Sequence, residues 1–403
     1  MFQIDQTKAS IKNAENDAPS MCAACGKSAF DLMMEDPTTG LSVDQNNTKK
    51  ALKRCTACYS VRYCGISCQK SHRKSHKKEC KETANKRRAF NAKLFELEMD
   101  ECVPVPPPPR DCDLCMYRMP PGAGRSKYFG CCGKIICKAC FSRSLSDGDI
   151  LSTLGKFGSM NESNPMERMQ YLMDTFGPNG QFSAEKRDEQ NGCPFCRSTE
   201  DMVVFNKKHQ KRREDCLLAR ANKSDSRALF ELACIHLVGC PKEITLLKDY
   251  DDIQTLPQDE QKAIEYFEKS AALGNCDAFY ELARRHRREY NAADFFTCLV
   301  KAADLGSTLA RDHLASLAME KKQTKVAMEH YKLLAVAGYN QTAIDMLTDG
   351  YKNGLITREE LASSLRTYQS AREELASEDR VRLDLMGMCL SSDGKIAHPD
   401  MYR

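Results

Sequence analysis

The side chains with the clearest chemistry in this chain are cysteines that recur in closely spaced pairs. Thiolate and imidazole groups at such spacings are the usual ligands of structural zinc. The first block of pairs contains Cys22, Cys25, Cys55, Cys58, Cys64, Cys68, His76 and Cys80. These eight side chains form four ligand pairs, in the order that two interleaved tetrahedral zinc ions require. Each structural zinc ion can contribute on the order of 10 kcal/mol to folding, so such a module needs almost no apolar core.

A second block offers eight further thiols, enough for two more zinc ions. Its members are Cys112, Cys115, Cys131, Cys132, Cys137, Cys140, Cys193 and Cys196. The two blocks together predict about four Zn²⁺ ions per chain. Cys131 and Cys132 are adjacent, and adjacent thiolates share one ion only with some backbone strain. Whether both of them are ligands therefore stays open.

Twenty-two cysteines in 403 residues allow two explanations, disulfides in a secreted protein or thiolate zinc sites in a reducing compartment. The first twenty residues are polar and contain no apolar stretch of the kind found in signal peptides. No apolar run approaches the roughly 18 residues that span a bilayer. Cysteine pairs with two residues between them also suit a tetrahedral ion better than a mutual disulfide. We therefore expect reduced cysteines, a cytoplasmic or nuclear location and no membrane partner.

The end of the first block, Tyr63-Cys64-x3-Cys68-Gln69 followed by His76-Lys77-x2-Cys80, resembles a MYND-type zinc finger. Two features differ from the family: Arg73 stands where the family has tryptophan, and 29 residues separate Cys25 from Cys55. The cross-brace of the family implies that one zinc is held by Cys22, Cys25, Cys64 and Cys68, and the other by Cys55, Cys58, His76 and Cys80. The resemblance also implies binding of proteins or peptides, including proline-rich ones. His72 is not needed to complete the eight ligands, so we expect it to be a solvated surface histidine.

The second block resembles a RING-type cross-brace. That arrangement implies one site made by Cys112, Cys115, Cys137 and Cys140, and another made by Cys131, Cys132, Cys193 and Cys196. Many RING domains dock a ubiquitin-conjugating enzyme through an apolar residue in the first turn, a proline in the last turn and a cation after the final cysteine. Leu114, Pro194 and Arg197 occupy these positions. The alternative is that Leu114 and Pro194 only pack these turns and that Arg197 is a solvated charge.

The elements between and after these blocks are distinct in composition. Residues 81–101 have the spacing of a short amphipathic helix. Val103–Pro109 is a polyproline segment, because its prolines cannot donate to a helix or a sheet. This segment is either a stiff spacer, a ligand that docks on the chain's own finger, or a ligand for another protein. Lys207–Arg213 is expected to be a basic connector.

The C-terminal region carries an internal repeat. Gly274, Gly306 and Gly338 are separated by 32 residues and then by 32 again. A period of this length with two helices per unit is typical of tetratricopeptide-type solenoids, and each glycine is expected to end a helix in the left-handed conformation. Residues 263–274 and 299–306 resemble Sel-like repeats, which act as scaffolds. About eighteen extra residues, Cys240–Pro257, interrupt the first unit and are expected to form a surface loop.

We therefore predict a multidomain protein with two small zinc-stabilised modules followed by an all-α helical-repeat solenoid. The expected segments are a disordered leader (1–20), a MYND-like finger (21–80), a basic helix with a proline-rich linker (81–110), a RING-like domain (111–198), Sel-like repeats (218–382) and a tail (383–403).

The favoured function is a zinc-binding adaptor for protein–protein interactions, with ubiquitin-ligase activity as a hypothesis for the RING-like domain and the repeats as the scaffold. The alternative is a nuclear or chromatin regulator that acts through the finger without enzymatic activity. Lys70–Lys93 contains ten basic and two acidic residues, which indicates either a nucleic-acid contact or a solvated helix. The net charge of +4 does not distinguish them. No catalytic triad, phosphate-binding glycine loop or pair of acids placed for hydrolysis is found in the sequence.

Overall fold

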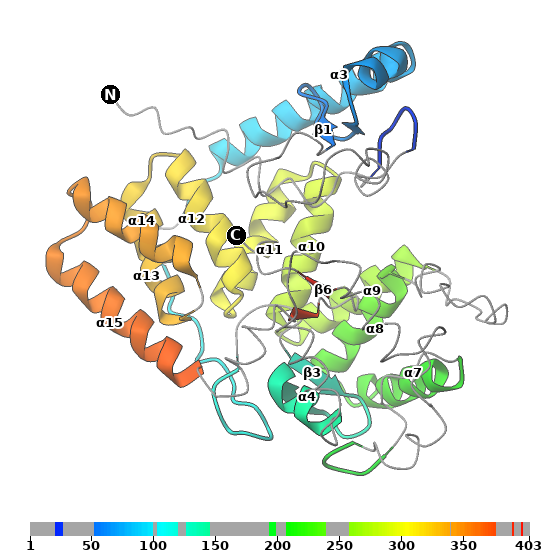
Figure 1. Cartoon of the computed structure of the whole chain (residues 1–403), viewed down its shortest axis with the longest axis vertical. Coiled ribbons are helices and arrows are strands. Elements are labelled where there is room, and N and C mark those ends of the chain that lie inside the picture. Colours follow the sequence, from blue (N-terminus) through cyan, green and yellow to red (C-terminus); the bar gives the residue numbers. More distant parts are fainter. Residues whose placement is uncertain are drawn as a thin grey trace, which may run out of the picture. The chain divides into compact units, whose positions relative to one another are not determined.

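The structure is a computed structural model of the chain (Figure 1) and describes residues 21–26, 52–99, 103–119, 126–145, 193–198, 207–238, 258–338, 340–375, 389–390 and 396–397. The chain divides into two compact units. The first consists of Met1–Asp100, Ala283–Thr297 and Ser316–Gln323. The second consists of Glu101–Leu282, Cys298–Ala315 and Thr324–Arg403.

The first unit contains the first cysteine block and one long helix. Strand β1 (Lys53–Arg54) pairs antiparallel with β2 (Arg62–Tyr63), and helix α3 (Ile66–Glu96) follows directly. Residues 81–96 are helical, as predicted, but the helix is longer than predicted, because α3 begins at Ile66 and enters this segment without a break. No glycine or proline occurs between residues 66 and 96, so nothing in this stretch ends the helix.

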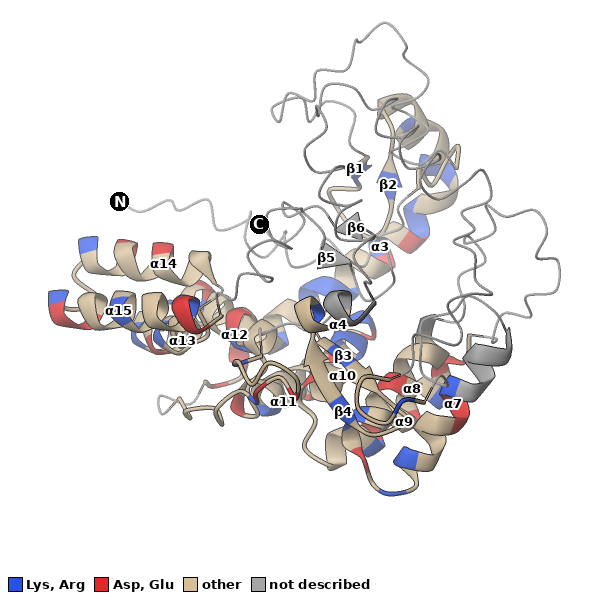
Figure 2. Ribbon diagram, turned by 60° about the horizontal axis from the view of Figure 1, so that its bottom comes forward, with Lys and Arg blue, Asp and Glu red and all other residues tan. Residues whose placement is uncertain are grey.

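The C-terminal part of α3 is held by aromatic packing inside the first unit. Phe90 is buried, and its ring centroid lies 5.6 Å from that of Phe295 and 6.3 Å from that of Tyr290. The ammonium group of Lys321 also donates a hydrogen bond to the carbonyl oxygen of Leu97. The outer face of α3 is rich in lysine and arginine, as the blue bands in Figure 2 show.

In the second unit the second cysteine block and two helices share one hydrophobic core. Strand β3 (Ser126–Phe129) pairs antiparallel with β4 (Lys134–Cys137), and α4 (Lys138–Leu145) follows. Helices α7 (Lys207–Ala221) and α8 (Ser226–Val238) pack against this hairpin. The fully buried side chains at this contact are Phe129, Ile136, Leu217 and Leu232. Lys207–Arg213, predicted to be a connector, therefore forms the first part of a packed helix.

A polar contact fixes the same junction. The hydroxyl of Tyr128 on β3 donates to Oδ2 of Asp225 at 2.6 Å. Oδ1 of Asp225 accepts from the backbone N–H groups of Arg227 and Ala228, which caps the start of α8. One aspartate thus joins the hairpin to the first turn of a helix.

The remaining helices are α9 (Glu260–Ala272), α10 (Cys276–Arg288), α11 (Ala292–Asp304), α12 (Thr308–Glu320), α13 (Thr324–Val336), α14 (Gln341–Lys352) and α15 (Arg358–Leu375). Helices α9, α11 and α13 begin 32 residues apart, as the sequence period predicts. Gly274, Gly306 and Gly338 have φ angles of 83°, 102° and 73°, which confirms the predicted left-handed helix ends. At the first two, the following N–H reaches back to close the last helical turn, from Asn275 to Ser270 and from Ser307 to Ala302.

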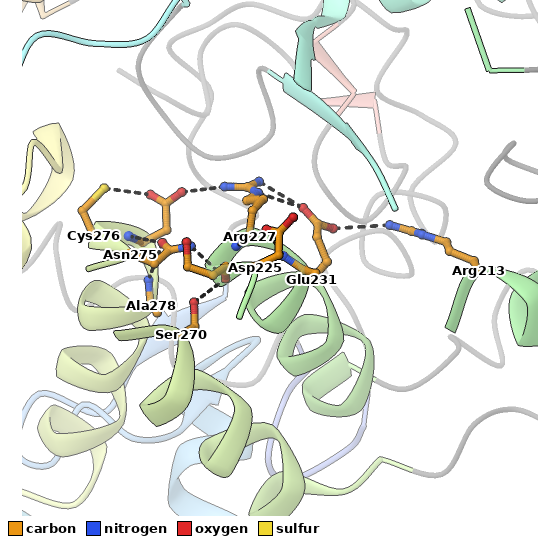
Figure 3. A network of polar contacts seen from close by, with 11 residues as sticks. Arg213, Asp225, Arg227, Glu231, Ser270, Asn275, Cys276 and Ala278 are labelled. Carbon is orange, nitrogen blue, oxygen red and sulfur yellow. Dashed lines mark hydrogen bonds and ion pairs between the residues drawn. The ribbon is translucent and has the colours of Figure 1, made fainter. Parts of the chain in front are cut away.

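A network of charged side chains ties α7, α8 and α10 together in the second unit (Figure 3). The guanidinium of Arg227 pairs with Glu231 at 3.0 Å and with Asp277 at 2.9 Å, and Arg213 reaches Glu231 at 3.3 Å. Burial alone would raise the pKa of Glu231, but the charges of Arg227 and Arg213 hold it below its ordinary value. This carboxylate therefore contributes to stability at neutral pH, and its contribution is lost as pH falls through its lowered pKa.

Two sequence predictions lie outside the described residues: the disordered leader 1–20 and the surface loop Cys240–Pro257. Within the expected tail, β5 (Cys389–Leu390) pairs antiparallel with β6 (Ile396–Ala397). Among the described residues, no helix combines the length and apolar character that crossing a bilayer requires.

Two repeat glycines provide a matched test of helix packing. Gly274 and Gly338 both have positive φ, so alanine at either position costs roughly 1–2 kcal/mol in backbone strain. At Gly338 the new Cβ would also lie 2.8 Å from Cβ of Ala371, whereas nothing lies within 4 Å at Gly274. We expect Gly338→Ala to lower the free energy of unfolding by about 1–3 kcal/mol more than Gly274→Ala, measured by urea denaturation. Equal losses would contradict the packing of Gly338 against α15.

Candidate metal centres

The structure gathers sixteen of the cysteine and histidine side chains into four groups of four. Within each group the ligand atoms all lie within 4.8 Å of one another. In the first block the groups are Cys22, Cys25, Cys64 and Cys68, and Cys55, Cys58, His76 and Cys80. In the second block they are Cys112, Cys115, Cys137 and Cys140, and Cys131, Cys132, Cys193 and Cys196. The membership is the same as in the two cross-braces that the resemblances imply.

The distances between the sulfur atoms fit ligands around a common ion. A Zn–S bond of about 2.3 Å in a tetrahedral site places neighbouring sulfurs about 3.8 Å apart. The separations are 3.7 Å for Cys25 and Cys64, 3.6 Å for Cys55 and Cys80, and 4.0 Å for Cys115 and Cys137. A disulfide would require about 2.05 Å. All described cysteines are free, so their spacing is that of separate thiols.

One backbone turn recurs at four of the cysteine pairs. In each, the residue after the second cysteine donates its N–H to the carbonyl of the first cysteine at 2.8–2.9 Å. The donor residues are Gly26, Tyr59, Met116 and Arg197, and all four have positive φ between 59° and 72°. A left-handed backbone is unfavourable for Tyr, Met and Arg. Each of these turns thus places two cysteine side chains on the same group, at the cost of a backbone conformation that also occurs at the helix ends Ser224, Tyr290 and Lys322.

The adjacent pair Cys131 and Cys132 uses a variant of the same turn. Gly133, with φ of 75°, donates to the carbonyl of Phe129 at 2.7 Å, so Cys132 takes the place of the second cysteine in the other turns. The sulfur of Cys132 lies 3.6 Å from that of Cys193. The sulfur of Cys131 lies 3.5 Å from that of Cys196. Both thiols therefore face the same group, at the turn between β3 and β4.

The electrostatics of the first group show what four thiols need in order to ionise together. Burial opposes ionisation of Cys22, yet backbone hydrogen bonds, including that of Cys64, lower its pKa to about 6. The hydrogen bond to Cys68, burial and the nearby Cys25 raise the pKa of Cys64 to about 12. One thiolate thus forms readily and discourages the next. A divalent cation removes this repulsion, which is why such a group fits Zn²⁺.

Three side chains lie close to the imidazole of His76, namely Cys58, Glu79 and His72. The ring nitrogen Nε2 of His76 lies 3.3 Å from the sulfur of Cys58, while Nδ1 lies 4.0 Å from the carboxylate of Glu79. That distance is beyond hydrogen-bonding range, and Nδ1 has no hydrogen-bond partner among the described residues. His72 belongs to none of the four groups, but it is not a solvated histidine as predicted. It is partly buried, hydrogen-bonds to Tyr63 at 3.1 Å and stacks on His76 with a centroid distance of 5.4 Å.

In the second block the turn Cys112–Met116 is hydrogen-bonded to strand β4. Oδ2 of Asp113 accepts from the N–H of Ile135 at 2.6 Å, and Lys134 lies 3.6 Å from its other oxygen. The N–H of Cys137 donates to the sulfur of Cys112 at 3.3 Å. The last turn packs on the same hairpin, because the rings of Phe195 and Phe129 meet edge to face at 6.2 Å.

The three residues expected to contact a conjugating enzyme differ in exposure. Leu114 is 44% exposed, Arg197 is exposed and Pro194 is partly buried. Met116 and Tyr117, which the sequence reasoning did not single out, are also exposed and extend the apolar surface of the first turn. Their signal in the sequence was an apolar pair directly after a cysteine ligand. The structure thus presents three apolar side chains together on this turn.

Comparison with known families matches residues 22–80 to the MYND finger. The chain therefore carries a MYND zinc finger at its first cysteine block, and MYND fingers bind zinc and mediate protein–protein interactions. The search of the curated proteins gave no match.

Four cysteines outside the four groups lie in described helices and are partly buried, namely Cys216, Cys234, Cys276 and Cys298. Burial and nearby acidic groups raise the pKa of Cys276 to about 12, and burial likewise raises the pKa of Cys234. The thiols of Cys234 and Cys276 are therefore protonated at neutral pH and behave as packing residues.

The adjacent cysteines give a direct test of the fourth group. We expect Cys131→Ser and Cys132→Ser each to lower bound zinc from four ions to three per chain, because each removes one of four thiolates. Elemental analysis of the purified full chain measures this. Cys276→Ser is the matched control and should keep four ions, because Cys276 belongs to none of the four groups. The fold should also be kept, since a serine hydroxyl can still donate to Asp277 as the thiol does. A Cys131→Ser or Cys132→Ser chain that keeps four ions would show that this thiol is not a ligand.

Proposed function

We propose that this chain is a zinc-dependent adaptor for protein–protein interactions whose RING-like segment, 111–198, acts as a ubiquitin ligase. In this proposal the sixteen grouped side chains bind four zinc ions. The MYND finger and the Sel-like repeats, 218–382, bind partner proteins, including proline-rich ones. The thiolate ligands require a reducing compartment, cytoplasmic or nuclear.

The interleaving of the last two groups supports the RING-like assignment. Along the chain, the pair Cys112 and Cys115 shares a group with Cys137 and Cys140, and the intervening Cys131 and Cys132 share one with Cys193 and Cys196. The first cysteine pair of the block thus shares a metal group with the third pair, and the second pair shares one with the fourth. Hairpin β3–β4 lies between them and carries ligands of both groups, so the two centres are parts of one module.

The observation that carries the ligase proposal is the exposed surface on the turns of these two groups. Leu114, Met116 and Tyr117 present apolar side chains next to the third group. Arg197 follows the last ligand of the fourth group, and its backbone is fixed by the hydrogen bond to Cys193 at 2.8 Å. An exposed guanidinium held in this way can donate to two carbonyl groups at once and keep a bound partner in one orientation.

The repeats support the adaptor part of the proposal. Helices α8 to α13 each contain 13 residues, and from α9 to α13 each helix begins 16 residues after the one before it. Repeats of helix pairs form extended surfaces on which other proteins bind. The second cysteine block shares a core with α7 and α8, so a partner bound near these helices is held at a fixed orientation to Leu114 and Arg197.

The ligase proposal is tested by autoubiquitination of the full chain with a panel of ubiquitin-conjugating enzymes. We expect Leu114→Ala and Arg197→Ala each to lower the rate at least about tenfold, a loss of about 1.4 kcal/mol in activation free energy. Leu365→Ala and Arg366→Ala are matched controls, because both residues are exposed on α15 and distant in sequence from any metal group. All four variants should keep their zinc. Undiminished transfer by Leu114→Ala and Arg197→Ala would refute the ligase assignment and leave the adaptor function.

A further inference from the structure

We propose that the turn between α11 and α12 is a binding site for polyproline II peptides and that the chain's own segment Val103–Pro109 occupies it. The segment and the turn both belong to the second unit. The site is independent of the four metal groups. It extends the proposed function by assigning a ligand class to one turn of the repeats.

The segment presents one face to the protein. A polyproline II helix has three residues per turn, so residues three apart lie on the same face. Val103 and Pro106 are partly buried, whereas Val105 and Pro108 are exposed, Val105 by 79%. The two partly buried positions are three residues apart, as on one face of a polyproline II helix, and the contacted face ends at Pro106 because Pro109 is exposed.

Arg311 supplies the polar part of the site. Its Nη2 donates to the carbonyl oxygen of Pro104 at 3.3 Å and to that of Ala303, in the last turn of α11, at 2.6 Å. The side chain is nine-tenths or more buried, with 2% exposure for the residue, and its Nη1 is a buried donor without a hydrogen-bond partner in the described residues. Arg311 therefore joins the segment to the last turn of α11 through a single nitrogen, Nη2.

The chemistry of the segment matches these donors. A proline-rich chain has carbonyl acceptors but few N–H donors, and in the polyproline II conformation it satisfies none of them internally. The surroundings of Arg311 also favour acceptors over cations. His330 is buried, and burial together with the charge of Arg311 lowers its pKa to about 4. A peptide that offers carbonyl groups to Arg311 is therefore the fitting ligand.

The turn itself is shaped to receive the segment. A Cβ atom built on Gly306 would lie 3.9 Å from Cβ of Pro106 and 4.0 Å from the carbonyl oxygen of Pro107. The prolines therefore pass directly over the glycine that ends α11. The sequence alternatives for this segment were a spacer, a ligand of the finger or a ligand of another protein, and the structure adds a ligand of the repeat.

Docking within one chain shields the site from other peptides. A tethered segment acts at an effective concentration on the order of 1 mM, so a peptide in solution must compete with it. A proline-rich partner would gain access when the tethered segment leaves. The contact can then regulate which partner the repeat holds.

The test compares the wild-type chain with a full-length chain in which residues 103–109 are replaced by alternating glycine and serine. The probe is a fluorescent peptide with the sequence of residues 101–111 and serine in place of Cys102. Fluorescence anisotropy should show at least about tenfold tighter binding to the replaced chain than to wild type. Arg311→Lys in the replaced chain should weaken binding at least about tenfold, because lysine keeps the charge but loses the planar pair of donors.

Peptide variants test the contacted face without changing the fold of the protein. A peptide with both Val103→Asp and Pro106→Asp should lose binding to the replaced chain. A peptide with both Val105→Asp and Pro108→Asp should bind within about twofold of the original sequence. Equal affinity for wild-type and replaced chains, equal effects of the two peptide variants, or binding insensitive to Arg311→Lys would each overturn the assignment. Binding insensitive to Arg311→Lys would mean that the peptide binds to another surface, such as the MYND finger.

Discussion

Four groups of soft ligands, each gathered into a volume that only a small ion can fill, impose the main constraint on this structure. Thiols that share such a space do not ionise equally: backbone hydrogen bonds lower the pKa of Cys22, whereas the hydrogen bond to Cys68 and burial raise that of Cys64. A divalent cation attracts all the thiolates of a group and fixes the surrounding backbone. The left-handed turns at Tyr59, Met116 and Arg197 each place two cysteine side chains on one group, in a backbone conformation that is unfavourable for these residues.

The second constraint is the apolar core that the second cysteine block shares with α7 and α8. Small zinc modules usually have little core of their own, and here Phe129 and Ile136 pack with Leu217 and Leu232 of the helices. The hydrogen bond from Tyr128 to Asp225 adds a directional link. Any partner bound on the surface of this block is consequently held by the same unit that carries the first helices of the repeat region.

Much of the local structure could be predicted from the sequence, and most of the long-range packing could not. The cysteine spacing predicted the MYND finger, which the family match at 22–80 confirms, and the glycine spacing predicted the left-handed ends of α9, α11 and α13. The continuation of α3 was missed because the cysteine pattern ends at Cys80 while the helix-favouring residues do not. The contact of Pro104 with Arg311 joins residues 207 apart, and no local pattern encodes such a pairing.

The most direct measurement of the metal account is X-ray absorption at the zinc edge of the purified full chain, combined with its zinc content. Fifteen cysteines and one histidine in four groups predict four ions per chain. The average shell should contain close to four sulfur atoms at about 2.3 Å and a small nitrogen contribution from His76. A shell dominated by oxygen, or a fully folded chain with two ions or fewer, would contradict the account.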